Sequence, residues 1–388
     1  MTLPCYRGFL NIFLSGIILS ILHKENDLKI AIIGLANSGK TTVFNALTGL
    51  NLETTIYPSL TAEPHTGVVK VPDTRVDKLT GIYGPKKTTY ATVEYIDYIG
   101  LTKGDVQQNR KVFDLIKDAD AIVHVIRMFG DESVVHPLGS IDPKRDAETI
   151  ELEMIFGDLE LVEKRLERME QGLKRGKKPD EAEKRLLMKC GKILEGEKPL
   201  RDAEFTDEEQ KAMRHLQFMS IKPEVILLNV HEQEMKSEKT LTATSELQSL
   251  FAGSKVRVLY LCGKIEMEIT QLSPDEAKVF LDDLGVPEPA LNKLIHVSYD
   301  LLGLISFLTV GDDEVRAWTI ESGMNAQKAA GKIHSDIERG FIRAEVVSYD
   351  DFIACGNMAG AREKGLLRLE GKTYEVKDGD IINFRFNV

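Results

Sequence analysis

Residues 28–41 read LKIAIIGLANSGKT, and the fold prediction for this chain starts from them. The first six form a short apolar run that ends at Gly34, a pattern typical of a strand buried inside a parallel sheet. The next eight match GxxxxGK[ST], and a helix is predicted from Lys40 to about Leu47. A strand, a glycine-containing loop and a helix in this order form the context that a phosphate-binding loop requires.

The residues of this loop have the chemistry that phosphate binding needs. Its glycines allow backbone N–H groups to converge on phosphate oxygens, and the helix N-terminus adds partial positive charge. Lys40 is expected to reach the β- and γ-phosphates of a nucleotide, and the Thr41 hydroxyl is placed to bind Mg²⁺.

Further short apolar runs alternate with helical stretches such as residues 109–117. This alternation predicts an α/β domain with a mostly parallel sheet. The further strands are predicted at residues 67–71, 93–97, 121–126, 224–229 and 256–261.

Length and composition exclude several classes of protein. The chain has 388 residues, of which 43% are hydrophobic and 29% are charged. At about 100–200 residues per domain we expect two or three domains, and collagen-like or wholly disordered chains are excluded. The net charge of −11 gives no overall attraction to nucleic acid or to an anionic membrane. Four cysteines lie far apart without a CxxC pair, which indicates reduced thiols in a cytoplasmic protein and no zinc site or disulfide framework.

Residues 1–27 are predicted to be an N-terminal extension that precedes the first strand. Residues 9–22 (FLNIFLSGIILSIL) are apolar, but this run is shorter than the about 20 residues that a membrane span needs. No small-residue cleavage site follows them. We therefore expect a dispensable extension and no membrane association.

A helical insertion is predicted within the α/β domain at about residues 146–204. Apolar residues from Leu152 to Leu173 are spaced alternately by three and four, which is the heptad spacing of a helix–helix seam. Gly176 then interrupts the pattern, and a second helix at residues 181–194 would complete an antiparallel hairpin. The tip (KRGKK) carries four basic residues, which suit either a solvated turn or a phosphate-contacting surface.

Residues 303–388 have a different pattern, in which short strands predominate. Two strands flank a turn at residues 311–313, and a single helix is expected at residues 326–337. A small mixed sheet that grips a helix, the β-grasp arrangement, fits this order. The strands are predicted at residues 304–310, 315–320, 342–347, 366–369, 373–376 and 381–386.

Two further motifs are expected to complete the nucleotide site. Asp97 and Gly100 form a DxxG at the end of an apolar strand, where the carboxylate would hold Mg²⁺ and the Gly100 N–H would sense the γ-phosphate. Thr61 lies in a loop between two prolines that is suited to fold over Mg²⁺. Leu101 stands where Ras-type GTPases have the Gln that orients the attacking water, so hydrolysis should be slow. The candidates to replace that Gln, each with a structural role as the stronger expectation, are Lys103, His124 and Arg127.

Base recognition is predicted after the last two strands of the α/β domain. Asn229 and Glu232 stand where GTPases carry NKxD, whose Asp accepts hydrogen bonds from guanine N1–H and the 2-amino group. Val230 replaces the Lys and a longer acid replaces the Asp, which weakens discrimination in favour of guanine. The residues expected to bring backbone amides to the purine edge are Leu261, Cys262 and Gly263.

Together these motifs resemble the YchF/Obg-like ATPase family, which belongs to the translation-factor class of P-loop NTPases. The resemblance covers about residues 28–388 and rests on LANSGKTT, SLTAEPHTGVV, DYIGL, NVHE, LISFLTVGDDEVRAWTI and DGDIINFRFNV. It implies an NTPase domain at residues 28–302 and a TGS domain at residues 303–388. It also implies a preference for ATP over GTP, with NxxE replacing NKxD, and association with ribosomal particles.

The resemblance also assigns roles to residues by their position. Thr41 and Thr61 would bind Mg²⁺, and Asn229 and Glu232 would face the base. The candidate catalytic residues are Lys40, Thr61 and Gly100, and the candidate Mg²⁺ ligands are Thr41, Thr61 and Asp97. The residues that would cradle phosphate are Asn37, Ser38, Gly39, Lys40, Thr41 and Thr42.

We therefore expect an ATPase that acts as a nucleotide-dependent switch with Mg²⁺ and associates with the ribosome or its large subunit. RNA contact through the helical hairpin or the TGS domain is part of this expectation. Two alternatives are a GTPase of the same fold and a regulatory protein that holds nucleotide with negligible turnover.

Overall fold

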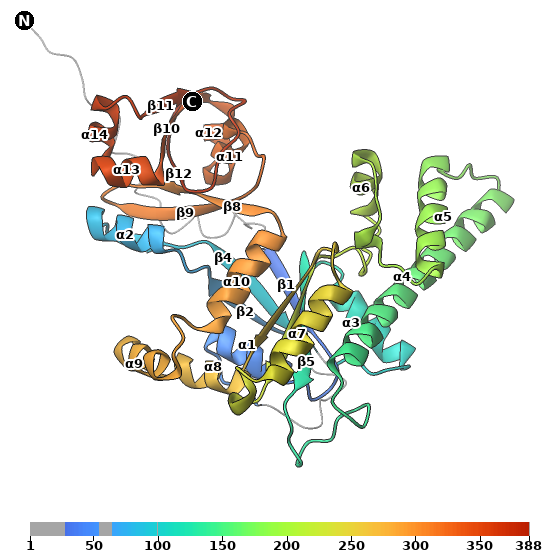
Figure 1. Cartoon of the computed structure of the whole chain (residues 1–388). Coiled ribbons are helices and arrows are strands. Elements are labelled where there is room, and N and C mark those ends of the chain that lie inside the picture. Colours follow the sequence, from blue (N-terminus) through green and yellow to red (C-terminus); the bar gives the residue numbers. More distant parts are fainter. Residues whose placement is uncertain (1–27, 54–63, 99, 388) are drawn as a thin grey trace, which may run out of the picture.

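The computed structural model describes residues 28–53, 64–98 and 100–387. These residues form two six-stranded sheets, and the second is built mostly from the C-terminal part of the chain (Figure 1). The predictions for residues 1–27 and for Thr61 lie outside the described residues. In the part of the chain that the structure describes, no helix is both long enough and apolar enough to span a bilayer.

The first sheet is mostly parallel, as predicted, with the strand order β2-β4-β1-β5-β6-β7. Only β2 runs antiparallel to its neighbour. Each predicted strand is confirmed to within two residues of its expected ends. The strands are β1 (Leu28–Ile33), β2 (His65–Lys70), β4 (Thr92–Asp97), β5 (Ala121–Met128), β6 (Glu224–Val230) and β7 (Val256–Leu261).

Helices cover both faces of this sheet, which explains why its strands are continuous apolar runs. On β1, Ile30 and Ile32 pack in the cluster that includes α1 and α10. Ala31 and Ile33 alternate with them and pack in the cluster that includes α3 and α4 (Pro143–Lys174). The helices around the sheet are α1 (Lys40–Thr48), α3 (Val106–Ile116), α7 (Glu238–Leu250), α8 (Gly263–Thr270), α9 (Pro274–Leu284) and α10 (Ala290–Leu301), with a 3-10 turn η2 (Glu232–Glu234). Helix α2 (Thr74–Tyr83) lies beside the second sheet instead (Figure 1).

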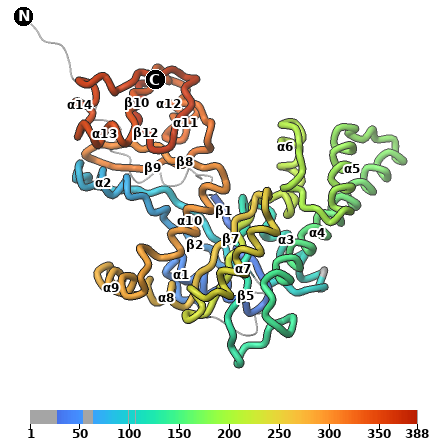
Figure 2. The backbone as a smooth tube through the Cα atoms, viewed as in Figure 1, coloured from blue at the N-terminus to red at the C-terminus, as the bar shows by residue number. Residues whose placement is uncertain are grey.

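The helical insertion is a hairpin that projects from the sheet on the side away from the C-terminal part (Figure 2). Its first helix begins earlier than the heptad pattern predicted, because the Asp142 side chain caps the helix and Pro143 occupies its first turn. Ile155 and Val162 pack against Leu186 of the second helix. Leu173, the last position of the predicted seam, is 55% exposed, so the apolar contact does not reach the tip. The elements are α4 (Pro143–Lys174), α5 (Glu181–Glu195), η1 (Leu200–Asp202) and α6 (Asp207–Met213).

The second sheet is mixed and has the strand order β11-β10-β12-β8-β9-β3. β12 and β8 run parallel, whereas β8 with β9 and β10 with β12 form antiparallel pairs. The edge strand β3 comes from the N-terminal half of the chain and was not predicted. The strands are β3 (Lys87–Thr89), β8 (Leu304–Thr309), β9 (Glu314–Glu321), β10 (Phe341–Ser348), β11 (Arg368–Glu370) and β12 (Asp380–Phe386).

Two predictions for this region were wrong. The single helix is two helices, because His334 adopts an extended backbone and its Nδ1 accepts the Asp336 N–H to cap the second one. Residues 373–376 form no strand; a single bridge joins Glu375 to Asn325. Two short helices after β10 were not predicted. The helices here are α11 (Ala326–Ile333), α12 (Ser335–Arg339), α13 (Tyr349–Cys355) and α14 (Met358–Glu363).

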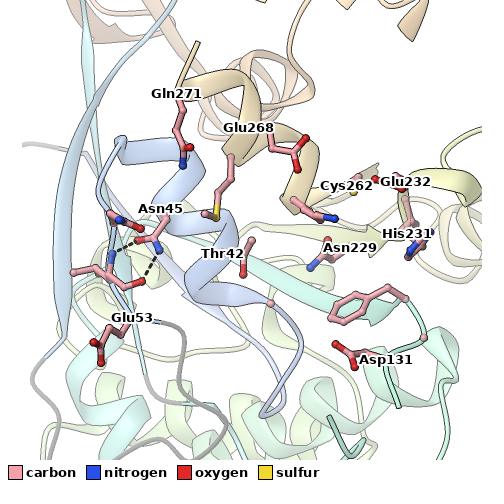
Figure 3. A pocket seen from close by; sticks show the side chains of 18 residues that line it. Thr42, Asn45, Glu53, Asp131, Asn229, His231, Glu232, Cys262, Glu268 and Gln271 are labelled. Atoms are coloured by element: carbon pink, nitrogen blue, oxygen red, sulfur yellow. Dashed lines mark hydrogen bonds between the residues drawn. The ribbon is translucent and has the colours of Figure 1, made fainter. Parts of the chain in front are cut away.

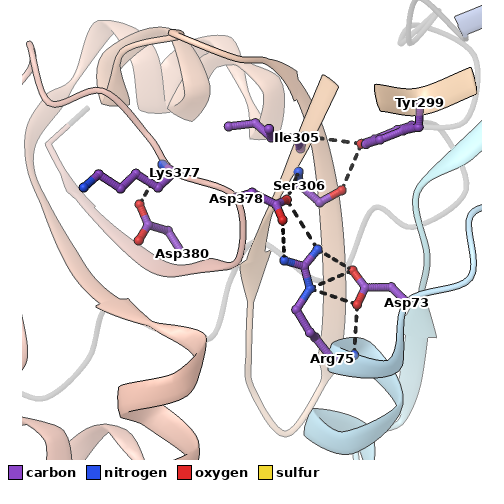
Figure 4. Close-up of polar contacts among 8 residues, drawn as sticks. All are labelled: Asp73, Arg75, Tyr299, Ile305, Ser306, Lys377, Asp378 and Asp380. Atoms are coloured by element: carbon purple, nitrogen blue, oxygen red, sulfur yellow. Dashed lines mark hydrogen bonds and ion pairs between the residues drawn. The ribbon is translucent and has the colours of Figure 1, made fainter. Parts of the chain in front are cut away.

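An ion-pair cluster joins α2 to the C-terminal part of the chain (Figure 4). Arg75 donates hydrogen bonds to Asp73 and, at 2.7 Å, to Asp378, which also accepts the Ser306 N–H. Burial alone would lower the pKa of the Arg75 guanidinium, but its bonds to the two carboxylates raise that pKa overall. With the pairing of β3 and β9, these bonds attach the two parts of the molecule to each other.

Candidate functional site

A cavity of about 1020 Å³ opens at the carboxyl ends of β5, β6 and β7, beside α1 and α8 (Figure 3). Ligands of open α/β sheets bind at this edge, and ligand pockets commonly measure about 300–1,000 Å³. The cavity is therefore large enough for a nucleoside triphosphate. Its lining includes Gly39, Thr42, Phe129, Asp131, Asn229, Glu232, Cys262 and Lys264.

The phosphate-binding loop connects β1 to α1, as predicted. Asn37 has a positive φ of 62°, and its side-chain amide donates to the Val135 carbonyl at 3.2 Å. Gly39, the N-cap of α1, has a φ of 88°, and a Cβ there would lie 2.1 Å from Asn229 Nδ2. Only glycine fits this position, so the loop lies directly against the end of β6.

Lys40 is buried and turns its ammonium group back into the loop. Its Nζ donates to the Leu35 carbonyl oxygen at 2.9 Å. Burial lowers the pKa of Lys40 to about 8, and the nearby Asp97 carboxylate partly opposes this shift. The ammonium group is therefore held in place before any phosphate is bound.

Thr41 and Asp97 meet as the sequence predicted, although 56 residues separate them. The Thr41 hydroxyl donates to Asp97 Oδ2 at 2.8 Å, while Oδ1 is buried without a hydrogen-bond partner. Burial raises the pKa of Asp97, whereas Lys40 and the Thr41 bond lower it. Hydroxyl and carboxylate oxygens are the ligands that Mg²⁺ prefers, so this pair fits Mg²⁺ bound together with phosphate. Among the described residues, no group of three or more His, Cys, Asp or Glu side chains is placed to hold a metal alone.

Gly100 lies against the phosphate-binding loop. A Cβ at Gly100 would be 2.8 Å from the Ala36 backbone and 3.1 Å from Lys40 Nζ. Leu101 is fully buried in the apolar cluster below the loop. Gln108, which the sequence analysis did not single out, donates from Nε2 to the Gly100 carbonyl at 3.1 Å.

Two of the candidates to replace the missing Gln form hydrogen bonds to other groups of the protein. His124 is buried and its Nδ1 pairs with Glu224 at 3.0 Å. Arg127 donates to the carbonyl oxygens of Phe129 and Asp131. These bonds fit the structural roles that were the stronger expectation, while His124 Nε2 and Arg127 Nη1 are buried without a hydrogen-bond partner.

Asn229 joins the phosphate-binding loop to the loop after β7. Its Nδ2 donates to the Ser38 carbonyl at 3.1 Å, and its Oδ1 accepts the Gly263 N–H at 3.0 Å. Both ends of the amide are thus used within the protein. Asn229 lines the cavity, but its polar atoms brace the two loops (Figure 3).

The other residues predicted for the base lie in three environments. Glu232 is exposed on η2 and lines the cavity together with the buried Cys262. Leu261 belongs to the apolar core of the sheet, so its side chain does not line the cavity. Gly263 begins α8, and its N–H is bound to Asn229.

Several residues that line the cavity were not identified from the sequence. They lie directly after β5 and β7, so the rule that ligands bind at the carboxyl ends of strands would have found them. They are Phe129, Gly130, Asp131, Lys264 and Met267.

A parallel sheet that carries a phosphate-binding loop after its first strand, with a DxxG beside it, defines the class of P-loop nucleoside triphosphatases. The sequence matches the family model MMR_HSR1, 50S ribosome-binding GTPase, over residues 29–156. It also matches YchF-GTPase_C, described as a protein of unknown function, over residues 304–387.

Curated relatives and a solved structure extend over nearly the whole chain. The ribosome-binding ATPase YchF of Bacillus subtilis is 45% identical over 360 residues, which cover 92% of this chain and 98% of that protein. The ribosome-binding ATPase YchF of Escherichia coli O157:H7 is 40% identical over 363 residues, which cover 93% of this chain and 99% of that protein. The structure of the Schizosaccharomyces pombe YchF GTPase has a TM-score of 0.78 at 29% identity and covers 92% of this chain and 98% of that one. The chain therefore belongs to the YchF family, which confirms the resemblance seen in its motifs.

Proposed function

We propose that this protein is an ATP-binding and ATP-hydrolysing switch that associates with the ribosome. The observation that carries the proposal is the phosphate-binding loop, where Lys40 and Thr41 lie beside Asp97 next to a cavity of nucleotide size. The names of the bacterial relatives, ribosome-binding ATPase, support both halves of the proposal. The cytoplasm, where ribosomes work, is the proposed location.

In the proposed reaction, Lys40 exchanges its bond to the Leu35 carbonyl for the β- and γ-phosphate oxygens. Burial disfavours the charged form of Lys40, and the phosphate charge would favour it. The Gly100 N–H is proposed to donate to the γ-phosphate, and Thr61 to close over the site. Thr41 and Asp97 would hold Mg²⁺, which when bound neutralises charge on the phosphates.

Turnover is proposed to be slow without a partner. Leu101 is apolar and fully buried, so it neither donates nor accepts a hydrogen bond to an attacking water. In Ras-type enzymes a Gln at this place orients that water. The group that replaces it here would therefore come from another part of the chain or from a partner.

The base site supports a preference for ATP over GTP. The Asn229 amide is bound to both loops, and Val230 is 2% exposed where GTPases have a lysine. The rejection of adenine by an NKxD aspartate depends on a well-placed acid, because adenine N1 gives it no donor. Glu232 is exposed and one methylene longer, so it does not enforce that rejection.

GTP remains the second candidate, since the solved fission-yeast relative is described as a GTPase. The test is to measure by calorimetry the affinities of the wild type for ATP and GTP with Mg²⁺. We expect ATP to bind at least as tightly as GTP, and Glu232→Asp with Val230→Lys to shift the preference towards GTP. If the wild type bound GTP more than about tenfold tighter, a difference of about 1.4 kcal/mol, the GTPase would replace the ATPase.

A further inference from the structure

Among the described helices, none covers one half-face of the second sheet. On one side of the sheet, Ala344 and Val346 of β10 pack in the cluster that contains α11. On the opposite side, Val347 of β10 and Ile381 of β12 pack in the cluster that contains Phe352 of α13. Beyond this contact, towards the start of β10 and the end of β12, the same side carries exposed residues. These are Arg343, Leu369 and Arg385.

Two arginines stand directly opposite each other on this half-face. Arg343 of β10 and Arg385 of β12 are cross-strand partners, so their side chains leave the sheet on the same side. Like charges in this position destabilise the pairing of the strands. Among the described residues, no hydrogen bond or ion pair connects the Arg343 guanidinium to a carboxylate. Arg385 is paired with Glu345, so the Arg343 guanidinium is the charge that a bound anion would complement.

A buried carboxylate orients the neighbouring arginines. Glu345 has a side chain that is 5% exposed and accepts hydrogen bonds from Arg385, from Arg362 of α14 at 3.0 Å and from Asn383 at 2.9 Å. Burial would raise the pKa of Glu345, but its bonds to Arg385 and Asn383 and the charge of Arg362 hold that pKa below its ordinary value. Glu345 is therefore ionised at neutral pH and pairs with Arg362 and Arg385, and Arg343 adds a further positive charge on the same side of the sheet.

We propose that this surface, the arginine face formed by Arg343, Arg362 and Arg385, binds the phosphate backbone of ribosomal RNA. The inference rests on the proposed association with the ribosome and specifies which surface makes contact. Guanidinium groups bind phosphate oxygens in a bidentate manner, and strand positions hold them with little loss of entropy. Phosphates follow one another along an RNA strand, which suits cations arranged on two adjacent strands and one helix. The positive surface is local, since the whole chain has a net charge of −11.

The test compares the wild type with a double variant that carries both Arg343→Ala and Arg385→Ala. The matched control is Lys328→Ala with Lys332→Ala on α11, which removes two exposed charges from the other side of the sheet. Co-sedimentation with purified ribosomes is measured from 50 to 200 mM salt. We expect the arginine variant to bind at least about tenfold more weakly, with a salt slope smaller by about 1.4–1.8 for two lost phosphate contacts. The affinity for ATP should stay unchanged, thermal unfolding should show that the variant is folded at the assay temperature even though Glu345 loses one partner, and the control should bind as the wild type does.

The outcomes separate this inference from the proposed function. If the wild type does not sediment with ribosomes, the proposed association fails. If the wild type sediments and the arginine variant does so with equal affinity and salt slope, the arginine face is refuted while the association stands. A labelled single-stranded RNA 20-mer is the second probe. If the variant loses ribosomes but binds this RNA as well as the wild type does, the face contacts a ribosomal protein and the RNA assignment is overturned.

Discussion

Replacing Asn229 by alanine tests whether this residue braces the site or recognises the base. The change removes the donor to the Ser38 carbonyl and the acceptor for the Gly263 N–H, both of which are buried hydrogen bonds. A buried group left without its partner costs about 1–3 kcal/mol. Water from the adjoining cavity can enter part of the space that the Asn229 side chain leaves and can bind one of the freed groups. We therefore expect the free energy of unfolding to fall by about 2–3 kcal/mol in total. This corresponds to a melting temperature lower by about 4–12 °C.

The assay is thermal unfolding by circular dichroism without nucleotide, followed by calorimetry with ATP, GTP and inorganic triphosphate. A brace that shapes the phosphate-binding loop predicts that all three affinities fall by the same factor. A base contact predicts instead that the affinities for ATP and GTP become more similar and that the affinity for inorganic triphosphate does not change. Asn51→Ala is the control, because its exposed side chain lines the same cavity and no hydrogen bond to it is found among the described residues. An Asn229→Ala protein with unchanged melting temperature and unchanged triphosphate affinity would refute the reasoning.

Three other predictions concern single groups. Lys40→Ala should weaken ATP binding at least about tenfold, as one charge-assisted bond contributes about 1.5–3 kcal/mol, and the protein should stay folded; unchanged calorimetric affinity would contradict it. Arg201→Met should lower the free energy of unfolding, measured by urea titration, by about 3–5 kcal/mol, because it removes the guanidinium that pairs with the buried Glu151 and Glu224. The control is Arg110→Met, which removes an exposed ion pair and should cost less than about 1 kcal/mol in the same titration. Burial raises the pKa of Asp158 to about 6, so the folded state binds a proton more readily than the unfolded state, and this contribution to stability is lost as the pH rises from about 4 to 6. Asp158→Asn should lack that part of the pH dependence, and identical melting curves against pH for both proteins would refute it.

Much of the first sheet was predictable because its strands are buried on both faces. Such strands are short continuous apolar runs, and residues such as Gly34, directly after β1, mark where they end. β3 was missed because Lys87–Thr89 is three residues long and has no apolar pattern. It exists as a strand through its pairing with β9, whose partner Glu314 is 227 positions further along the chain, and local sequence carries no sign of that contact. The interruption at His334 was missed for a similar reason, since helix propensity continues through it and only the backbone turn separates α11 from α12.

The site was predictable where function depends on position along a strand. Lys40 and Thr41 begin the helix after β1, Asp97 is the last residue of β4, and the carboxyl ends of parallel strands meet at one edge of the sheet. The bracing role of Asn229 was not predictable, because it depends on Ser38 and Gly263 approaching the same side chain from two different loops. Leu261 was expected to lie in the loop beside the base. It is instead the last residue of β7, and its side chain packs in the apolar core.

The segment between β2 and β4 connects the two parts of the molecule in a way that bears on its use as a switch. β4 ends at Asp97, which is bound to Thr41 of the phosphate-binding loop, and His65 at the start of β2 is its cross-strand partner. Between these strands the chain forms α2, whose Arg75 holds Asp378, and β3, which completes the second sheet. A hydrogen-bonded sheet and a partly buried ion pair resist independent movement far more than a flexible linker would. Asp97 and the C-terminal part of the chain are therefore joined through the elements between β2 and β4, which both parts of the molecule share.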